Sequence, residues 1–348
     1  MSYFRPNIDA MAGYQPGEQP RGGEFIKLNT NENPYPPSPA VLEAIRRTAD
    51  EGLRKYPDPM ATAFREQAAR LLGVEPDWIL AGNGSDDLLT IVTRSFVGMG
   101  ELVVAPTPSY ILYRSLAEIQ GASYDEVPFT DAWGLPDRFA QSDARLTFLP
   151  NPNSPSGTMI DSTRVRQLAE RLRGSSPLVV DEAYVDFANQ NCVSLVRELD
   201  NVIVTRTLSK SYSLAGIRFG FAVAQPQLIA GMIKVKDSYN CDAVSIAVAT
   251  AAVADQAHFR QNIARVRATR DRLTEAMRPF GFHTPDSQAN FVWCTNGPAP
   301  ARRLYEELKT RRILVRYMNY PGYGDGLRIS VGSDAEIDQL LGELPKLI

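Results

Sequence analysis

The stretch Val202-Ile203-Val204-Thr205-Arg206-Thr207-Leu208-Ser209-Lys210 is a short apolar run that ends in hydroxyl side chains and a lysine. Comparable apolar runs occur at Leu102–Ala105, Arg145–Leu149, Leu178–Val180 and Phe219–Val223. Segments with the apolar spacing of helices precede or separate these runs, at Pro39–Glu51, Ala61–Leu72, Asp87–Phe96, Tyr110–Gln120, Asp161–Arg173 and Gln227–Lys236. Apolar strands that alternate with helices are typical of an α/β fold with a mostly parallel sheet.

The C-terminal part has a different order of elements. A long helical pattern over Gln256–Arg278 is followed by a β-α-β-β-α pattern at Asn290–Cys294, Ala299–Arg311, Ile313–Arg316, Leu327–Val331 and Asp334–Leu344. We therefore expect a smaller α/β domain whose boundary lies within the long helix. The predicted division is an N-terminal arm over residues 1–38, a large domain over 39–265 and a small domain over 266–348.

Composition excludes several classes of protein. The chain has 348 residues, 44% of them hydrophobic, and a net charge of −3, so no global basic field favours nucleic acid or an anionic membrane. No apolar stretch of about 18 residues predicts a membrane span, and the N-terminus lacks the apolar core of a signal peptide. The three cysteines, Cys192, Cys241 and Cys294, are far apart and form no metal-binding cluster with the two histidines. This usage predicts a reducing, cytoplasmic location and no metal site.

Two strand ends carry side chains that suit a carbonyl cofactor. Lys210, one of only seven lysines, follows the run Val202–Thr205, where it can form a Schiff base or simply be a solvated loop residue. Asp181 ends the run Leu178–Val180, and either caps the next helix or pairs with the protonated ring nitrogen of pyridoxal phosphate. Tyr184 is three residues further on, and either binds the ring oxygen of such a cofactor or is an ordinary half-buried tyrosine.

Other loops supply the remaining parts of such a site. Gly82-Asn83-Gly84-Ser85-Asp86 opens a helix, whose N-terminus favours an anion, although the same residues also suit a plain turn and cap. Ser209 and Arg218 add a hydroxyl and a guanidinium suited to phosphate. Tyr110 can stack on an aromatic ring, and Asn153 can donate from its amide, each directly after a strand. Together these residues form the parts of a pyridoxal phosphate site.

The chain resembles the fold-type I pyridoxal-phosphate-dependent aminotransferases and, among them, the histidinol-phosphate aminotransferase family. The resemblance covers nearly the whole chain and is carried by Lys27–Pro34, Tyr56–Asp58, Gly82–Asp86, Asn151–Gly157, Asp181–Tyr184, Thr207–Tyr212, Ala215–Gly220, Ile313–Arg316 and Leu327–Gly332. It implies a large domain with a mostly parallel seven-stranded sheet between helices, and a smaller C-terminal α/β domain.

The resemblance also implies roles for individual residues. Lys210 would bind the cofactor carbonyl and move a proton, Asp181 would hold the ring nitrogen, and Tyr184 would contact the ring oxygen. The implied cofactor contacts are Ser85, Asp86, Tyr110, Asn153, Asp181, Tyr184, Ser209, Lys210, Arg218 and, from the other subunit of a homodimer, Tyr56. The implied substrate contacts are Tyr14, Asn33, Asn153, Tyr239, Asn240, Arg316 and Arg328. Arg328 would bind an α-carboxylate, Arg316 a substrate phosphate, and Tyr239 would reach across the dimer.

The activity that the resemblance implies is transamination between L-histidinol phosphate and 2-oxoglutarate, which yields imidazole acetol phosphate and glutamate in histidine biosynthesis. Two alternatives share the scaffold, an aromatic amino acid aminotransferase and a threonine-phosphate decarboxylase. A cofactor-binding regulator fused to a DNA-binding module is disfavoured, since no basic helical module precedes Gly82. The expected partners are small molecules and a second copy of the chain, with neither nucleic acid nor membrane.

Overall fold

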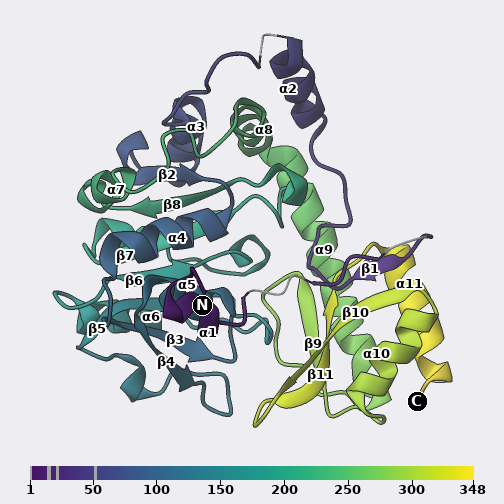
Figure 1. Ribbon diagram of the computed structural model, residues 1–348. Coiled ribbons are helices and arrows are strands. Elements are labelled where there is room, and N and C mark those ends of the chain that lie inside the picture. Colours follow the sequence, from purple (N-terminus) through teal and green to yellow (C-terminus); the bar gives the residue numbers. More distant parts are fainter. Residues whose placement is uncertain (1, 14–16, 21–22, 51–52) are drawn as a thin grey trace.

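Two β-sheets organise the chain in the computed structural model, which describes residues 2–13, 17–20, 23–50 and 53–348 (Figure 1). The larger sheet has seven strands in the order β2-β8-β7-β6-β5-β3-β4. Their bounds are β2 Ile79–Gly82, β3 Leu102–Thr107, β4 Ser123–Pro128, β5 Ala144–Pro150, β6 Leu178–Asp181, β7 Val202–Thr207 and β8 Gly220–Ala224. All neighbouring pairs are parallel except those of β8, which runs antiparallel to both β2 and β7.

Helices cover both faces of this sheet, so the large unit has three layers. One apolar core lies between the sheet and the helices α4 Ser85–Phe96, α5 Leu112–Gln120 and α7 Pro226–Ile233. The other lies between the sheet and α2 Pro39–Asp50, α3 Thr62–Leu72, α6 Ser162–Leu172 and α8 Ala243–Ala254. The strands β5 to β8 are buried along almost their whole length, as expected for a sheet covered on both faces.

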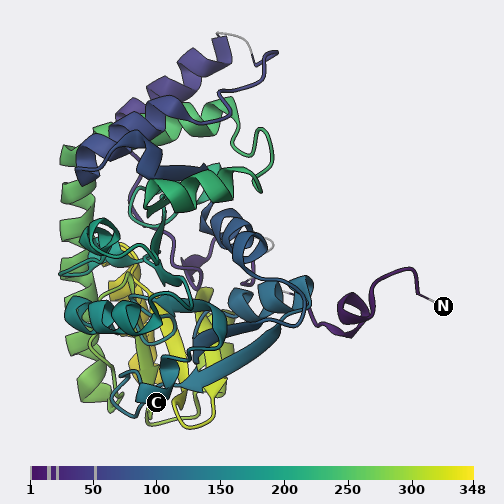
Figure 2. The ribbon, with the colours of Figure 1, turned by 90° about the vertical axis from the view of Figure 1, so that its left-hand side faces the viewer.

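The smaller sheet has four strands in the order β1-β10-β11-β9. Their bounds are β1 Ile26–Leu28, β9 Phe291–Thr295, β10 Ile313–Tyr320 and β11 Gly324–Ser330. The helices α9 Gln256–Met277, α10 Ala301–Thr310 and α11 Asp334–Glu343 pack on it around a separate apolar core. The long helix α9 runs alongside both units (Figures 1 and 2). The three-part division predicted from the sequence stays a prediction.

The N-terminal segment projects from the body and returns to it (Figure 2). Its short helix α1 Pro6–Ala10 lies against α5, where Asn7 Nδ2 donates to the carbonyl of Glu118 over 2.7 Å. Further along, β1 pairs in parallel with β10 and so becomes an edge strand of the small sheet. The extended arm expected from the sequence therefore contains one helix and one strand.

The fold class is the one predicted, and most predicted elements are present within two or three residues of their expected ends. Besides α1 and β1 in the N-terminal segment, three elements were not recognised from the sequence, namely β2, β4 and α8. Helix α8, with the sequence AVSIAVATAAVA, packs against both α2 and α3 and is apolar on all sides. Its sequence therefore lacks the alternation of apolar and polar residues that identifies a helix with one exposed face. Strand β4 is an edge strand with charged side chains, which hides its strand character. Among the described residues, no helix is long and apolar enough to cross a membrane.

Candidate active site

A cavity of about 620 Å³ lies between the carboxyl ends of the large sheet and the strands β10 and β11 of the small one. Ligands bind at this edge in open α/β sheets. The predicted site residues that line it are Ser85, Asp86, Tyr110, Asp181, Tyr184, Ser209, Lys210, Arg218, Arg316 and Arg328. The structure therefore brings together residues that are up to about 240 positions apart in the sequence.

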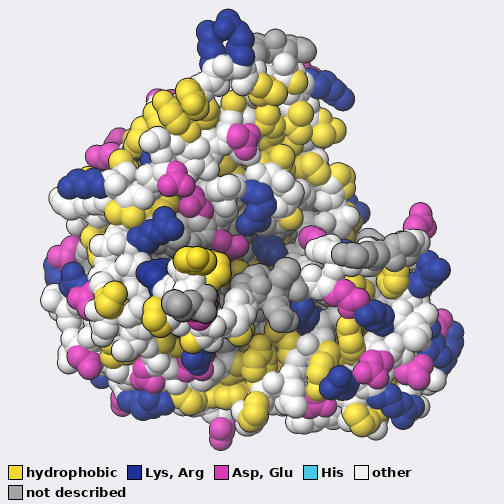
Figure 3. All heavy atoms as spheres, viewed as in Figure 1, with side chains coloured by type: hydrophobic (Ala, Val, Ile, Leu, Met, Phe, Trp, Pro, Cys, Tyr) yellow, Lys and Arg dark blue, Asp and Glu magenta, His cyan; other side chains and the backbone are white. Residues whose placement is uncertain are grey.

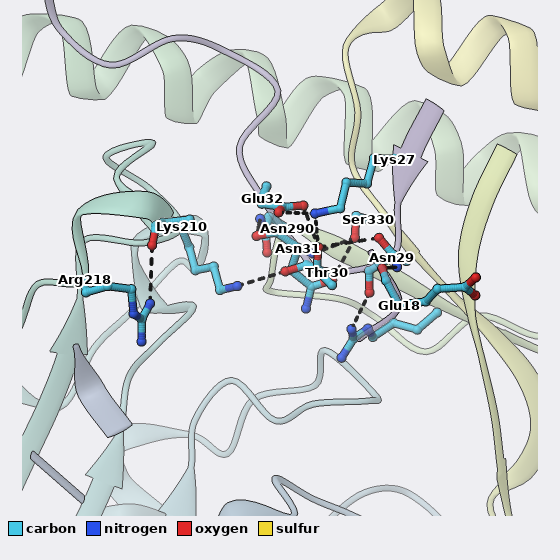
Figure 4. A network of polar contacts seen from close by, with 12 residues as sticks. Glu18, Lys27, Asn29, Thr30, Asn31, Glu32, Lys210, Arg218, Asn290 and Ser330 are labelled. Atoms are coloured by element: carbon cyan, nitrogen blue, oxygen red, sulfur yellow. Dashed lines mark hydrogen bonds and ion pairs between the residues drawn. The ribbon is translucent and has the colours of Figure 1, made fainter. Parts of the chain in front are cut away.

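Lys210 extends into the cavity from the loop after β7. Its Nζ donates a hydrogen bond to the carbonyl of Thr30 over 3.0 Å (Figure 4). Burial, together with the nearby Arg328 guanidinium, lowers the pKa of this amine to about 8, against the opposing effect of Glu32. A pKa near 8 leaves an appreciable fraction of Lys210 as the neutral amine, which is the nucleophilic and basic form.

Asp181 is the last residue of β6 and is only 5% exposed. One carboxylate oxygen accepts from the Tyr113 hydroxyl over 2.7 Å, and the other accepts from Thr205 Oγ1 over 3.3 Å. Burial raises the pKa of this carboxyl group to about 6, although both hydrogen bonds favour the charged form. Its partners among the described residues, these two hydroxyls and the backbone N–H of Ala183, are all neutral. The buried carboxylate therefore still lacks a cation, which a protonated ring nitrogen would supply.

The turn before α4 is arranged to bind an anion. Strand β8 is antiparallel, so its first residue, Gly220, lies in register with Gly82 at the same edge as the other strand ends. A Cβ on Gly220 would lie 2.7 Å from the backbone nitrogen of Ser85, so only glycine permits this approach. Arg218 Nη1 reaches Ser209 Oγ over 3.3 Å, next to the N-terminus of α4. Free helical N–H groups, a hydroxyl and a guanidinium are suitable ligands for a phosphate.

Two arginines face each other across β10 and β11. Arg316 and Arg328 are register partners in the antiparallel pair, and both side chains line the cavity. Arg328 also donates to Ser154 Oγ and to the carbonyl of Asn29, each over 2.9 Å. It lies on an inner strand of the sheet and is therefore not a surface charge on an edge strand. Like charges directly opposite each other are destabilising in a sheet, which indicates a site for an anion.

Tyr110 and Asn153 lie at the neighbouring strand ends. The Tyr110 hydroxyl donates to Asp86 Oδ1 over 3.1 Å, and the ring lines the cavity. Asn153 is 2% exposed and lies behind the lining residues, with its Nδ2 donating to Pro108 O and Ser156 Oγ. Its amide oxygen has no hydrogen-bond partner among the described residues. Both of its amide N–H groups already have acceptors, so a donor role toward a cofactor would require one of these hydrogen bonds to be given up.

Besides Asn153, four predicted site residues that the structure describes do not line the cavity of their own chain. Asn33 is turned toward the backbone of Ser211 and Tyr35. Asn240 Nδ2 donates to Ala81 O and to Asp87 Oδ2, so in this chain it supports the turn before α4. Tyr56 and Tyr239 lie on the surface, 81% and 46% exposed, with their rings stacked 4.5 Å apart. Tyr14 lies outside the described residues.

Several lining or supporting residues were not assigned a role from the sequence. The segment Asn29–Glu32 lines the cavity, Tyr113 binds Asp181, and Ser154 and Tyr320 complete the wall. The stretch Lys27–Pro34 was noted as part of the resemblance, but its spacing gave no hint of which side chains it directs inward. Tyr113 is the second residue of α5 and is fully buried, which is equally typical of a core residue.

The cavity fits pyridoxal phosphate on this structure's own geometry. It has a buried lysine with a lowered pKa, a buried carboxylate without a cation, and a glycine-lined helix N-terminus beside a guanidinium. These groups match the carbonyl, the ring nitrogen and the phosphate of the cofactor. No cluster of histidine, cysteine and acidic side chains suited to a metal ion occurs in residues 2–13, 17–20, 23–50 and 53–348.

A family model described as aminotransferase class I and II matches residues 23–344, and the chain therefore belongs to this family of pyridoxal-phosphate-dependent enzymes. Relatives of similar sequence include the histidinol-phosphate aminotransferase of Rhodopirellula baltica, which is 55% identical over 96% of this chain and 93% of the relative. Histidinol-phosphate aminotransferase 1 of Trichormus variabilis is 48% identical over 100% and 99% of the two chains. Within the family, the chain is thus a member of the histidinol-phosphate aminotransferase group.

A solved structure agrees with this assignment. The crystal structure of histidinol-phosphate aminotransferase from Sinorhizobium meliloti in complex with pyridoxal-5'-phosphate superimposes with a TM-score of 0.91. The two chains are 29% identical, and the match covers 100% of this chain and 98% of the other. The predictions of fold class, enzyme class and cofactor are confirmed: this is a fold-type I aminotransferase whose cofactor is pyridoxal 5'-phosphate.

Proposed function

We propose that this enzyme transfers the amino group of L-histidinol phosphate to 2-oxoglutarate, forming imidazole acetol phosphate and glutamate in histidine biosynthesis. The relatives' names support the first substrate. The observation that carries the proposal is the cross-strand pair of Arg316 and Arg328 in the cavity. Among the described residues, no carboxylate forms an ion pair with Arg316, which leaves it available for a substrate phosphate or carboxylate.

One pair of arginines can serve both substrates. The phosphate of histidinol phosphate and the carboxylates of glutamate are all oxyanions with a geometry that guanidinium groups bind in pairs. Because the two substrates bind in turn, the same cavity wall needs to hold only one of them at a time. Arg328, beside Lys210, would bind the group nearer to the reacting carbon, and Arg316 the more distant one. Glu32 is neutralised by its ion pair with Lys27, so it does not repel such anions strongly.

When bound, pyridoxal phosphate takes up the electron pair released at the substrate carbon and carries the amino group between the substrates. Lys210 Nζ would then take the proton from the substrate α-carbon, for which its pKa of about 8 is well matched. Asp181 would hold the ring nitrogen in its protonated form, and the helix N-terminus at Ser85 would anchor the phosphate with Arg218. These residue roles are part of the proposal.

The proposal includes a homodimer. Figure 3 shows hydrophobic side chains gathered over α2, α3 and α8, and Leu42, Leu53, Tyr56 and Tyr239 are the large exposed ones in this region. An exposed apolar patch of this kind is typical of an interface between proteins. The stacked pair Tyr56–Tyr239 is exposed and does not line the cavity of its own chain, which supports its contribution to the site of a partner.

The activity is tested by adding L-histidinol phosphate and 2-oxoglutarate to enzyme loaded with cofactor and measuring glutamate. We expect glutamate to form only when both substrates are present. Release of carbon dioxide from L-threonine phosphate, without glutamate from histidinol phosphate, would contradict the proposal and favour the decarboxylase. The cytoplasmic location expected from the cysteines stays a prediction, which cell fractionation would test.

A further inference from the structure

Asn31 is a buried residue in a strained backbone conformation next to the cavity. It is 1% exposed, and its φ of +57° lies in the left-handed region, which residues other than glycine rarely adopt. Figure 4 shows it at the centre of a polar network between Lys210 on one side and Ser330 on the other. Such strain persists only where the surroundings fix it, and it is concentrated at functional sites.

Every polar group of Asn31 has a partner. Its backbone N–H donates to Ser330 Oγ over 2.9 Å, and its carbonyl accepts from Asn290 Nδ2 over 3.0 Å. In the side chain, Oδ1 accepts from Ser330 Oγ over 2.9 Å, and Nδ2 donates to the Tyr184 hydroxyl oxygen over 3.0 Å. The first three contacts hold the residue to the small-sheet side of the cavity, and the fourth reaches a predicted catalytic tyrosine.

These contacts favour one orientation of the amide. Because Ser330 Oγ accepts from the Asn31 backbone N–H, its own hydrogen needs an acceptor, which is Oδ1. A reversed amide would place a second N–H group against Ser330 and deprive the serine hydrogen of this acceptor. The satisfied orientation is therefore the one in which Nδ2 faces Tyr184.

The Tyr184 hydroxyl can donate its hydrogen only toward the cavity. A phenol has a single O–H, and the oxygen of Tyr184 is already an acceptor for Asn31. No described residue accepts the Tyr184 hydrogen, and the side chain lines the cavity. The ring is held edge-on against Phe291, with centroids 5.0 Å apart. Burial raises the pKa of Tyr184, so the hydroxyl keeps its hydrogen near neutral pH.

We propose that Asn31 is a positioning residue which, by donating to the Tyr184 oxygen, directs the Tyr184 hydrogen into the cavity toward the 3-hydroxyl oxygen of the cofactor. The inference rests on the proposed function, because it requires the cofactor to bind in this cavity. It explains why a residue other than glycine is kept at a positive φ here. The neighbouring carbonyl, that of Thr30, holds Lys210, so one segment positions two functional side chains.

The test compares binding of two cofactor forms to the apoenzyme, pyridoxal phosphate and 3-deoxypyridoxal phosphate, which lacks the ring hydroxyl. Asn31→Asp keeps the shape and tolerates the left-handed conformation, but replaces the donor by an acceptor, so the Tyr184 hydrogen turns away from the cavity. We expect this variant to bind pyridoxal phosphate about 10- to 100-fold more weakly and the deoxy form nearly as well as wild type does. Dissociation constants from equilibrium dialysis give both values.

Two further variants separate positioning from general damage. In a Tyr184→Phe background, Asn31→Asp should cause no additional loss of pyridoxal phosphate binding, because the hydrogen it redirects is absent. Asn290→Ala is the matched control, since it removes the contact with the Asn31 backbone carbonyl but leaves the side-chain amide with its partners Ser330 and Tyr184. It should weaken both cofactor forms equally and slightly. If Asn31→Asp does not fold, Asn31→Gly keeps the conformation, and we expect a smaller loss that is again selective for pyridoxal phosphate.

The outcomes are distinct. Equal binding of pyridoxal phosphate by Asn31→Asp and wild type, or an equal loss for both cofactor forms, would overturn the role of Asn31 and leave the proposed function intact. A wild-type protein that binds neither form would instead overturn the proposed function, and this inference with it.

Discussion

The amine of Lys210 is enclosed in the cavity beside the guanidinium of Arg328, and this location decides its protonation near neutral pH. An ordinary lysine has a pKa near 10.5 and is almost entirely charged at pH 7. With a pKa of about 8, roughly a tenth of Lys210 is neutral at the same pH. Such an amine can react with a carbonyl without prior activation.

We therefore predict the pH dependence of cofactor capture by the apoenzyme. The rate constant should rise with pH and level off above a midpoint near 8, because only the neutral amine reacts. The appearance of the absorbance band of lysine-bound cofactor measures this rate, and Lys210→Ala should show no such band. A rate that continues to rise up to pH 10 would mean that the site does not lower the pKa of Lys210.

Asp181 provides a prediction about stability. Folding raises its pKa from 3.8 to about 6. Between these two pH values, Asp181 is therefore protonated in the folded apoprotein but ionised in the unfolded chain. Burial of the ionised carboxylate lowers the free energy of unfolding. This loss is absent below about pH 4, where Asp181 is protonated in both states, and is complete above about pH 6, where it is ionised in both. Asp181→Asn removes this charge, and its apoprotein should be more stable than wild type at pH 8 by on the order of 1–3 kcal/mol.

Urea unfolding of both apoproteins checks this difference, which should shrink as the pH falls toward 4. The same variant should hold pyridoxal phosphate poorly, since the ring nitrogen loses its counter-charge. A variant less stable than wild type at pH 8 would show that the hydrogen bonds of Tyr113 and Thr205 outweigh the cost of the buried charge.

At the scale of elements, the hairpin of β10 and β11 carries Arg316 and Arg328, the two arginines that we propose bind the substrates. Residues that face each other in such a hairpin gain from opposite charges and lose from like charges, by about 0.2–1 kcal/mol. Arg316 and Arg328 are such a like-charged pair, so they repel each other. The chain therefore gives up some stability at this position for the sake of an anionic ligand.

Arg316→Gln should separate the contribution of Arg316 to substrate binding from its repulsion of Arg328. We expect the KM for L-histidinol phosphate to rise at least about 10-fold, because a charge-assisted contact with the phosphate is lost. The free energy of unfolding should stay equal or rise slightly, since the repulsion disappears. Steady-state kinetics and urea unfolding give both quantities, with the exposed Arg302→Gln as a control that should change neither. An unchanged KM would exclude Arg316 from phosphate recognition.

The elements that the sequence predicts well are those with a clear apolar period. Strands such as β6 and β7 are buried on both faces, and the carboxylate and the lysine that follow them could be placed at one edge of the sheet. The position of Arg218 could not be derived in this way, because it depends on the antiparallel direction of β8. Asn31 and Tyr113 act through contacts with distant residues, which no local pattern reveals.

At the scale of the whole molecule, the two tyrosines that the cavity lacks lie together on the outer surface. Tyr56 and Tyr239 stack on each other, so in the proposed dimer one subunit would offer both to its partner. Asn240 connects this pair to Asp87 at the start of α4 in the same chain. In the proposed dimer, the phosphate-binding turn of one site is thus linked to the tyrosines of the other.

Mixed dimers test this arrangement. Lys210→Ala and Tyr56→Ala should each be nearly inactive alone, while their equimolar mixture after unfolding and refolding should recover roughly a quarter of wild-type activity. The recovered site combines Lys210 of one subunit with Tyr56 of the other. Mixing Lys210→Ala with Asp181→Asn is the control and should recover nothing, because both changes lie in the same half of the site. Absence of recovery in the first mixture would contradict the sharing of Tyr56.

The measurement that tests the proposed reaction most directly is a half-reaction titration without an acceptor. Cofactor-loaded enzyme is mixed in turn with L-histidinol phosphate, L-histidinol and L-phenylalanine, and the loss of the absorbance of lysine-bound cofactor is followed. We predict conversion at far lower concentrations of histidinol phosphate than of the other two amines. Its phosphate can engage both Arg316 and Arg328, whereas phenylalanine offers a carboxylate to Arg328 alone and histidinol offers no anion. Equal conversion by phenylalanine, or none by histidinol phosphate, would contradict the substrate assignment and favour an aromatic aminotransferase.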